Sequence, residues 1–214
     1  KPVFVRHRTP DEIKANIVAY YAMITHMDEQ IGKIISALDE KGLRDNTLIV
    51  FSSDNGLAVG QHGLMGKQNL YDGSWRVPMI LAGPGIPRGE SRDGLAYLHG
   101  LYPTLASFAG LDAPKYTQPF EFASVIRGES EGLERVFGAY MPNVKVPKGV
   151  RTVREGEWKL LYYTHSGRKQ LFNLNKDPWE TNDLIGDPEY AGKIDQMFGA
   201  LQTWMSNSGD PLGK

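Results

Sequence analysis

The chain has 214 residues, 41% of them hydrophobic, and a formal net charge of −1 at pH 7. A chain of this length buries roughly 70% of its unfolded surface, enough for one domain or one and a half. The near-zero charge gives no electrostatic preference for nucleic acid, and the apolar runs are too short to cross a bilayer. Because cysteine is absent, disulfides and thiolate metal sites are excluded. We therefore expect a folded chain that binds neither nucleic acid nor membranes.

A long helix is predicted at the start of the chain. Thr9 is a suitable N-cap, Pro10 takes the first helical position, and Glu12 completes a capping box. Apolar residues then recur at three- and four-residue intervals as far as Leu38, which predicts one apolar stripe along the helix. Gly42 is typical of a residue that ends a helix.

The segment that follows, from residue 47 to residue 52, is β-branched and apolar, and it predicts a strand buried in a parallel sheet. It ends at Asp54, Asn55 and Gly56. Loops at the carboxyl ends of parallel strands are where open α/β folds bind ligands, and carboxylate and amide oxygens suit Ca²⁺ or Mg²⁺. An Asx-turn explains the same three residues without a metal. Both interpretations stay open from the pattern alone.

The remaining elements are shorter. We predict a strand at 78–82, a helix at 101–109 that ends at Gly110, strands at 150–154, 158–164 and 170–174, and a helix at 189–205. A hairpin turn is expected near Ser166 and Gly167. Aromatic residues alternate along the last strands and should fill the core of a small antiparallel sheet, with stacking on a sugar or aryl group as the alternative. These residues are Trp158, Tyr162, Tyr163 and Phe172.

Several short motifs recur in one order along nearly the whole chain. They are SSDNG at 52–56, GQHGLMGK at 60–67, LAGPGI at 81–86, LYPTL at 101–105, LFNL at 171–174 and DPWE at 177–180. Together they resemble the sulfatases, a family of the alkaline phosphatase superfamily. The resemblance implies an α/β fold in two parts. Residues 1–134 would be the carboxyl-terminal part of an alkaline phosphatase-like α/β sheet domain, with its metal loop at 52–67, and residues 135–214 a small antiparallel sheet with a C-terminal helix.

The resemblance also implies roles for individual side chains. Asp54 and Asn55 would bind Ca²⁺, with Mg²⁺ as the alternative, and Lys67 would contact the sulfate or the leaving oxygen, where an ammonium stabilises developing charge. A solvated surface lysine is the plainer interpretation of Lys67. His62 would touch the sulfate, donate a proton or brace the metal loop. Arg76 is a weaker candidate for substrate binding, because its position favours an internal ion pair.

Part of a complete sulfatase is absent. Members of the family carry a C/S-x-P-x-R motif near their amino terminus, in which the Cys or Ser is oxidised to formylglycine, and paired aspartates that complete the metal site. This chain contains no such motif. The resemblance therefore implies a fragment of a sulfuric ester hydrolase for aryl or carbohydrate sulfate esters. Its nucleophile would lie upstream, its metal site would be incomplete, the isolated chain would be inactive, and the location would be periplasmic or secreted.

Two other functions fit the same motifs. A phosphonate monoester or phosphodiester hydrolase of the same superfamily shares this metal loop. A non-catalytic, sulfatase-derived scaffold would retain the fold without the reaction. A sheet edge and an apolar face left open by a missing half would favour self-association of the fragment.

Overall fold

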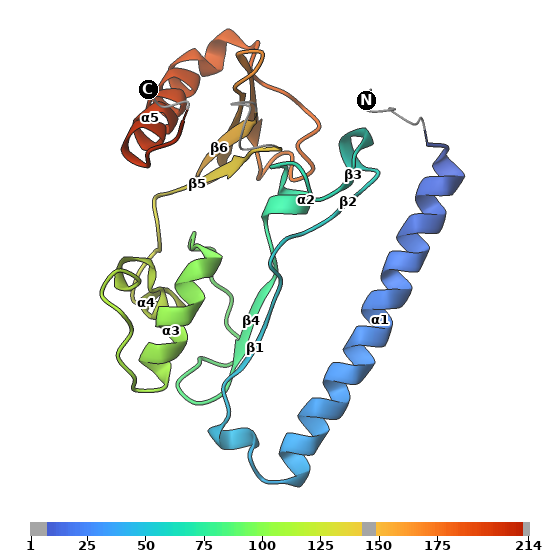
Figure 1. Cartoon of the computed structure of the whole chain (residues 1–214), viewed down its shortest axis with the longest axis vertical. Coiled ribbons are helices and arrows are strands. Elements are labelled where there is room, and N and C mark those ends of the chain that lie inside the picture. The colour runs from blue at the N-terminus through green and yellow to red at the C-terminus, as the bar shows by residue number, and fades with distance from the viewer. Residues whose placement is uncertain (1–7, 143–148, 212–214) are drawn as a thin grey trace.

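The computed structural model describes residues 8–142 and 149–211, so the predicted domain limits at residues 1 and 214 lie outside the described part. Figure 1 shows a mixed α/β chain in which the long helix α1 runs along one side and a two-stranded ribbon, β1 with β4, occupies the middle. A four-stranded antiparallel sheet with the C-terminal helix α5 lies beyond it. The α/β fold class and the small sheet with its helix are therefore confirmed.

Helix α1 (Pro10–Glu40) begins and ends where the sequence predicts. The Glu12 amide donates to the Thr9 hydroxyl (3.2 Å), the Thr9 amide donates to the Glu12 carboxylate (2.9 Å), and Gly42 adopts φ +62° after the last turn. The apolar stripe, however, is not covered. No residue of α1 is buried, and Met27 and Ile34 of the stripe are 43% and 65% exposed.

Strand β1 (Ile49–Ser52) corrects one prediction. It pairs antiparallel with β4 (Met79–Ala82), so that Ile49 faces Ala82, and all four of its residues are only partly buried. The expectation of a buried parallel strand is therefore wrong. Within the described residues, β1 pairs antiparallel and is only partly buried. Apolar composition reports how much of a strand packs, whereas the direction of its neighbour depends on which segment returns beside it.

Most of the short elements between β1 and the small sheet were not predicted. The chain passes through η1 (Arg44–Asn46), β2 (Ala58–Val59), η2 (Gln61–Gly63), β3 (Met65–Gly66) and α2 (Asp72–Trp75). Farther on come η3 (Leu98–Gly100), α3 (Leu101–Phe108), η4 (Gln118–Phe120) and α4 (Ala123–Arg127). The helix predicted at 101–109 is confirmed as α3, and Gly110 follows it with φ +70°.

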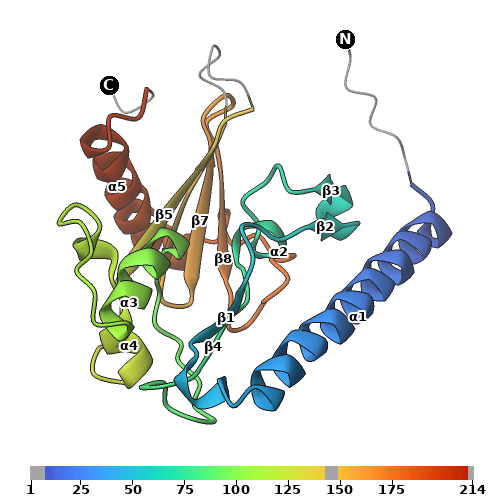
Figure 2. The same cartoon turned by 60° about the horizontal axis from the view of Figure 1, so that its bottom comes forward.

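The small sheet contains β5 (Arg135–Tyr140), β6 (Val150–Glu155), β7 (Trp158–Tyr163) and β8 (Arg168–Asn173), in that order. The three predicted strands and the hairpin between β7 and β8 are confirmed, but β5 was missed. Helix α5 (Ala191–Asn207) follows the short η5 (Pro188–Tyr190). Figure 2 shows α5 and α2 on opposite sides of this sheet.

Each face of the small sheet buries its own apolar cluster. Under α5 the cluster consists of Val153, Leu160, Leu171, Met197, Leu201 and Met205. On the other face, Leu161, Phe172 and Leu174 pack with Leu70, which comes from the segment just before α2. The sheet is therefore covered on one side by its own C-terminal helix and on the other by the segment that leads away from the predicted metal loop.

A buried ion cluster joins α2 to this sheet. Lys159 of β7 is fully buried, and its Nζ lies 2.6 Å from Asp72 Oδ1 and 2.7 Å from Glu180 Oε1. The contact with Glu180 lies outside hydrogen-bond geometry and acts as an ion pair. Glu180 also accepts a hydrogen bond from the Asp72 amide at 2.6 Å. One cation thus neutralises two carboxylates, one from each side of the junction.

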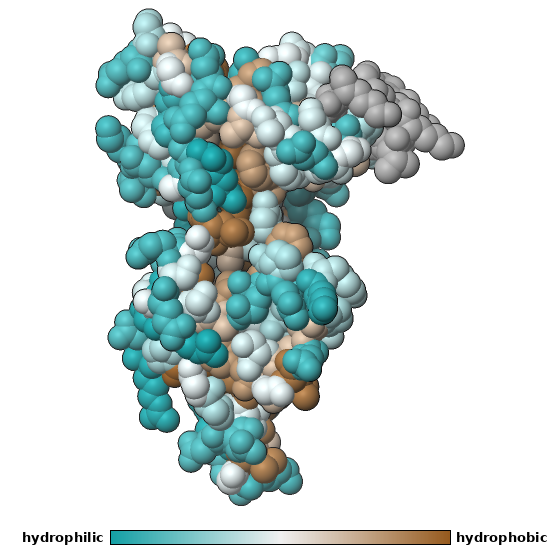
Figure 3. All heavy atoms as spheres, turned by 90° about the vertical axis from the view of Figure 1, so that its left-hand side faces the viewer, coloured by the Kyte–Doolittle hydropathy of each residue, from teal (hydrophilic) through white to brown (hydrophobic). Residues whose placement is uncertain are grey.

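Apolar surface is left open elsewhere. Besides the stripe of α1, apolar atoms gather where the molecule narrows between the small sheet with α5 and the region of α3 and α4 (Figure 3). Contiguous apolar surface of this kind marks interaction sites. None of the described helices has the length and apolar character needed to span a membrane.

We expect the 214-residue chain to self-associate through the open stripe of α1. The double variant Met27→Glu with Ile34→Glu places charges on this stripe and should shift the mass measured by light scattering toward the 23.8 kDa of one chain. The exposed small residues of the same helix provide the control, Ala19→Glu with Ser36→Glu, which should leave association unchanged. A monomeric unmodified chain would contradict this expectation.

Removal of the Lys159 ammonium should strongly destabilise the fold. The variant Lys159→Met leaves Glu180 buried without its cation and leaves Asp72 with only the 3.5 Å contact to Arg154, and loss of one partner from a buried ion pair costs about 3–5 kcal/mol. Urea denaturation measures the change in the free energy of unfolding. The matched control is Lys33→Met, because Lys33 pairs with Glu29 at 3.0 Å on the exposed face of α1. That control should change stability by less than about 1 kcal/mol.

The buried carboxyl of Glu180 should make stability depend on pH. Burial raises the pKa of Glu180 above its ordinary value of 4.5, although the charge of Lys159 acts in the opposite direction. A raised carboxyl pKa means that the folded state favours the protonated form, so this contribution is complete below pH 4.5 and is lost as the pH rises through the folded pKa. The variant Glu180→Gln cannot ionise. Relative to the unmodified chain, it should become progressively more stable in urea denaturation as the pH rises above the ordinary carboxyl pKa of 4.5. A stability difference independent of pH would disprove the assignment.

Candidate functional site

The loop after β1 folds back on itself and brings two predicted site residues together. Its short strands β2 and β3 pair antiparallel, with Ala58 opposite Gly66 and Val59 opposite Met65. Ala58 and Val59 are buried and hold this hairpin in place. The chain therefore returns at Lys67 to the start of the loop, where Lys67 Nζ donates to Asn55 Oδ1 at 2.8 Å.

The carboxamide of Asn55 is oriented by its neighbours. Its Nδ2 donates to the Gly56 carbonyl at 3.1 Å, which leaves Oδ1 as the acceptor for Lys67. The Gly56 amide donates to the carbonyl of Ser74 at 2.9 Å and is therefore not held by the side chain of Asp54. The Asx-turn that would have explained Asp54 without a ligand is thus not formed at this position.

The donor atoms of Asp54 and Asn55 fit a hard cation in type but not in number. Asp54 is exposed and Asn55 is partly buried, and both present oxygen, which Ca²⁺ and Mg²⁺ prefer. Ca²⁺ takes about six to eight oxygen ligands. Within residues 8–142 and 149–211, no group of three or more His, Cys, Asp or Glu side chains could hold a metal ion. Asp54 and Asn55 by themselves therefore supply too few ligands for such an ion.

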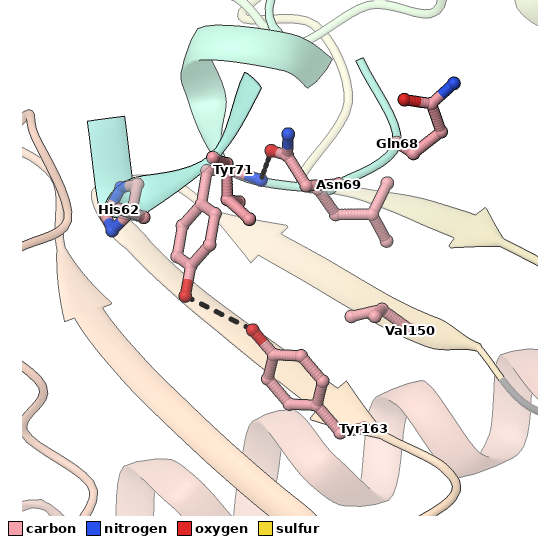
Figure 4. A pocket seen from close by; sticks show the side chains of 8 residues that line it. His62, Gln68, Asn69, Tyr71, Val150 and Tyr163 are labelled. Carbon is pink, nitrogen blue, oxygen red and sulfur yellow. Dashed lines mark hydrogen bonds between the residues drawn. The ribbon is translucent and has the colours of Figure 1, made fainter. Parts of the chain in front are cut away.

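His62 lies on the other side of the loop, against the small sheet. It adopts the left-handed conformation, with φ 54°, and its ring stacks on Tyr71 with centroids 3.7 Å apart and planes inclined by 8° (Figure 4). Burial lowers the pKa of His62, and the nearby charge of Lys159 lowers it further, while the Trp179 backbone and Asp177 partly oppose them. Of the roles expected for His62, this geometry favours bracing of the loop.

The internal ion pair that the sequence predicts for Arg76 is not formed within the described residues. Arg76 is exposed, and it forms no ion pair with any residue that the structure describes. The expected internal ion pair belongs instead to Asp72, which contacts Lys159 and, at 3.5 Å, Arg154. The reason is local, because Asp72 opens α2 on the side of the sheet whereas Arg76 follows its last residue.

A cavity of about 220 Å³ lies between the loop and the sheet. Its loop side includes His62 and Tyr71, and its sheet side includes Val150 and Tyr163 (Figure 4). The hydroxyls of Tyr71 and Tyr163 both donate to Gln170 Oε1 at 2.8 Å, and burial together with Tyr71 raises the pKa of Tyr163. Both phenols therefore point their hydroxyl groups at Gln170, and the aromatic surface expected at a cleft edge comes partly from Tyr163.

Sequence reasoning missed the residues that attach this loop to the sheet. Ser74 and Lys159 carry no motif of their own, and Asp72, the partner of Lys159, lies 87 residues away. The only available signal was the DPWE motif, whose glutamate is Glu180. It marks the segment without showing what Glu180 contacts.

Comparisons with known proteins agree with these motifs. The sulfatase family model matches residues 4–111, and a model described as N-sulphoglucosamine sulphohydrolase, C-terminal, matches residues 60–207. The choline-sulfatase of Rhizobium meliloti is 35% identical over 191 residues, which cover 88% of this chain and 36% of the relative.

Solved structures share the fold. A protein in complex with its substrate, D-glucosamine-2-N,6-O-disulfate, is 28% identical with a TM-score of 0.79, and the match covers 91% of this chain and 42% of that protein. The phosphonate monoester hydrolase of Agrobacterium radiobacter is 24% identical with a TM-score of 0.80, over 93% of this chain and 43% of that protein, which shows the fold alone.

The chain spans less than half the length of each of these proteins. Across that span, the two family models together match residues 4–207 and include the loop that joins Asn55 to Lys67. The chain belongs to the sulfatase family.

Proposed function

We propose that this chain is the carboxyl-terminal part of a sulfuric ester hydrolase that cleaves aryl or carbohydrate sulfate esters. The observation that carries the proposal is the 2.8 Å contact between Lys67 and Asn55. It places a cation and a hard oxygen donor side by side in a chain of the sulfatase family. A sulfate ester is an anion whose charge shifts onto the leaving oxygen as the bond breaks, and the Lys67 ammonium offers a partner for such charge.

Each polar side chain of the loop has a distinct part in this proposal. Asp54 and Asn55 would bind Ca²⁺, with Mg²⁺ as the alternative, and the remaining ligands would come from outside this chain. When present, the metal supplies Lewis-acid polarisation of the sulfate, and a formylglycine outside this chain supplies the nucleophile. Lys67 would hold the sulfate and stabilise charge on the leaving oxygen. His62 would brace the loop through its stack on Tyr71.

The organic part of the substrate is proposed from the relatives and from the cavity. One structural relative was solved with the sulfated sugar D-glucosamine-2-N,6-O-disulfate as its substrate. The cavity beside the loop presents aromatic side chains and neutral hydroxyl groups, which suit a sugar or aryl group. For the cellular location we keep the expectation from the family, which is periplasmic or secreted.

Substitution of Lys67 in the longer protein that carries this chain should abolish most of the activity. We expect Lys67→Met to lower kcat for p-nitrophenyl sulfate by about 10²–10³-fold, the loss typical when one group that stabilises developing charge is removed. The control Lys33→Met removes an exposed lysine of α1 and should retain full activity.

A parallel assay with a phenyl phosphonate monoester separates the proposals. Faster hydrolysis of the phosphonate than of the sulfate would favour a phosphonate monoester hydrolase. Hydrolysis of neither ester by the longer protein, in the presence of Ca²⁺, would disprove the enzymatic proposal and leave the non-catalytic scaffold.

A further inference from the structure

Helix α2 contacts both ends of the loop that carries the proposed site. The Gly56 amide, which directly follows Asn55, donates to the Ser74 carbonyl at 2.9 Å. The approach is too close for a side chain, because a Cβ on Gly56 would lie 2.2 Å from the carbonyl oxygen of Gly73. The turn that presents Asn55 therefore rests directly on the backbone of α2.

The hydroxyl of the same serine contacts the other end of the loop. Ser74 Oγ accepts a hydrogen bond from Asn69 Nδ2 at 2.8 Å and donates a longer, weaker one to the carbonyl of Gly66 at 3.4 Å. Gly66 and Asn69 flank Lys67 in the sequence, and the Asn69 amide donates to the Lys67 carbonyl at 2.9 Å. Ser74 is 4% exposed, so these bonds are shielded from water.

The small sheet in turn fixes α2. Asp72, two residues before Ser74, is held by the buried ammonium of Lys159 and, through its amide, by Glu180. Trp75, the next residue after Ser74, lies with its ring 5.2 Å from Lys159 Nζ. Ser74 therefore lies between two residues that contact the same buried cation.

We propose that Ser74 is a positioning residue that holds Asn55 and Lys67 in register. Its carbonyl would fix the Asn55 turn, and its hydroxyl would fix the segment on either side of Lys67. The inference rests on the proposed function, in which Asn55 and Lys67 are the working groups. The Lys67 side chain is exposed and has many conformations to lose, so a fixed backbone at its base reduces the freedom lost on reaching Asn55 and the substrate.

The local part of the proposal is tested on the 214-residue chain by native-state hydrogen exchange. Ser74→Ala removes the hydroxyl and keeps the carbonyl. It should accelerate exchange of the amides in β2, β3 and Asn69 by about tenfold or more, the consequence of a lost buried hydrogen bond. Exchange in β6 and β7 should stay unchanged.

The matched control is Thr152→Val, which removes another buried hydroxyl. Thr152 Oγ1 donates to the Leu160 carbonyl at 2.9 Å inside the small sheet, so the bond that is lost does not involve the loop. This variant should accelerate exchange in the sheet and leave β2 and β3 unchanged. If Ser74→Ala accelerates exchange uniformly, or no more in the loop than Thr152→Val does, the positioning role is overturned.

The functional part is tested in the longer protein with p-nitrophenyl sulfate at saturating Ca²⁺. Ser74→Ala should lower kcat by about 10–100-fold, as loss of an outer partner of a site does, with KM nearly unchanged because Lys67 acts chiefly on the developing charge. Thr152→Val should retain kcat within about twofold, as expected for a site outside the proposed machinery.

The two proposals fail in different ways. If the longer protein hydrolyses no sulfate ester, the proposed function fails, and hydrogen exchange alone decides whether Ser74 orders the loop. If it does hydrolyse the ester and Ser74→Ala retains the full kcat, the positioning role is overturned while the proposed function stands.

Discussion

The placement of α2 against the small sheet depends on one buried cation, Lys159. Lys159 is fully buried in the middle of the small sheet, and its ammonium contacts a carboxylate from each side of the junction between the sheet and α2. Burial of three ionised groups is unfavourable unless each has close partners, so the cluster tolerates little displacement. Any movement of α2 away from the sheet would separate Asp72 from Lys159. The position of α2 is therefore set by electrostatics as much as by the apolar packing of Leu70 beside it.

The parts of the molecule around this junction differ in how completely their side chains are buried. The small sheet has an apolar cluster on each face, whereas α1 buries none of its residues and β1 is only partly covered. The loop with Asn55 and Lys67 lies between these extremes. It has a buried hairpin at Ala58 and Val59, but its functional side chains are mostly exposed. Rigid support for a site on such a loop has to come from the better-packed small sheet. Helix α2 is the element that contacts both the loop and the sheet.

The sequence allowed the local features to be predicted and missed those that depend on distant partners. The capping box of α1 and the β7–β8 hairpin are contained within a few residues, so their patterns are sufficient. The direction of β1 and the existence of β5 depend on which segments lie alongside them, and composition does not report this. Asn55 and Lys67 were singled out as site residues only through the family motifs, and the contact between them was not predicted. Ser74 and Lys159 were missed because the residues next to them in the sequence do not indicate what they contact.

The protonation of His62 bears on which side chain of the proposed site acts on the leaving oxygen. Partial burial and the charge of Lys159 lower the pKa of His62, and its ring is already engaged by Tyr71. A stacked histidine whose charged form is disfavoured is a poorer general acid. Under the proposed function, stabilisation of the leaving oxygen by this chain then falls to Lys67. The same buried Lys159 that holds α2 in place thus also disfavours the charged form of His62, so one cation affects both the geometry of the loop and its chemistry.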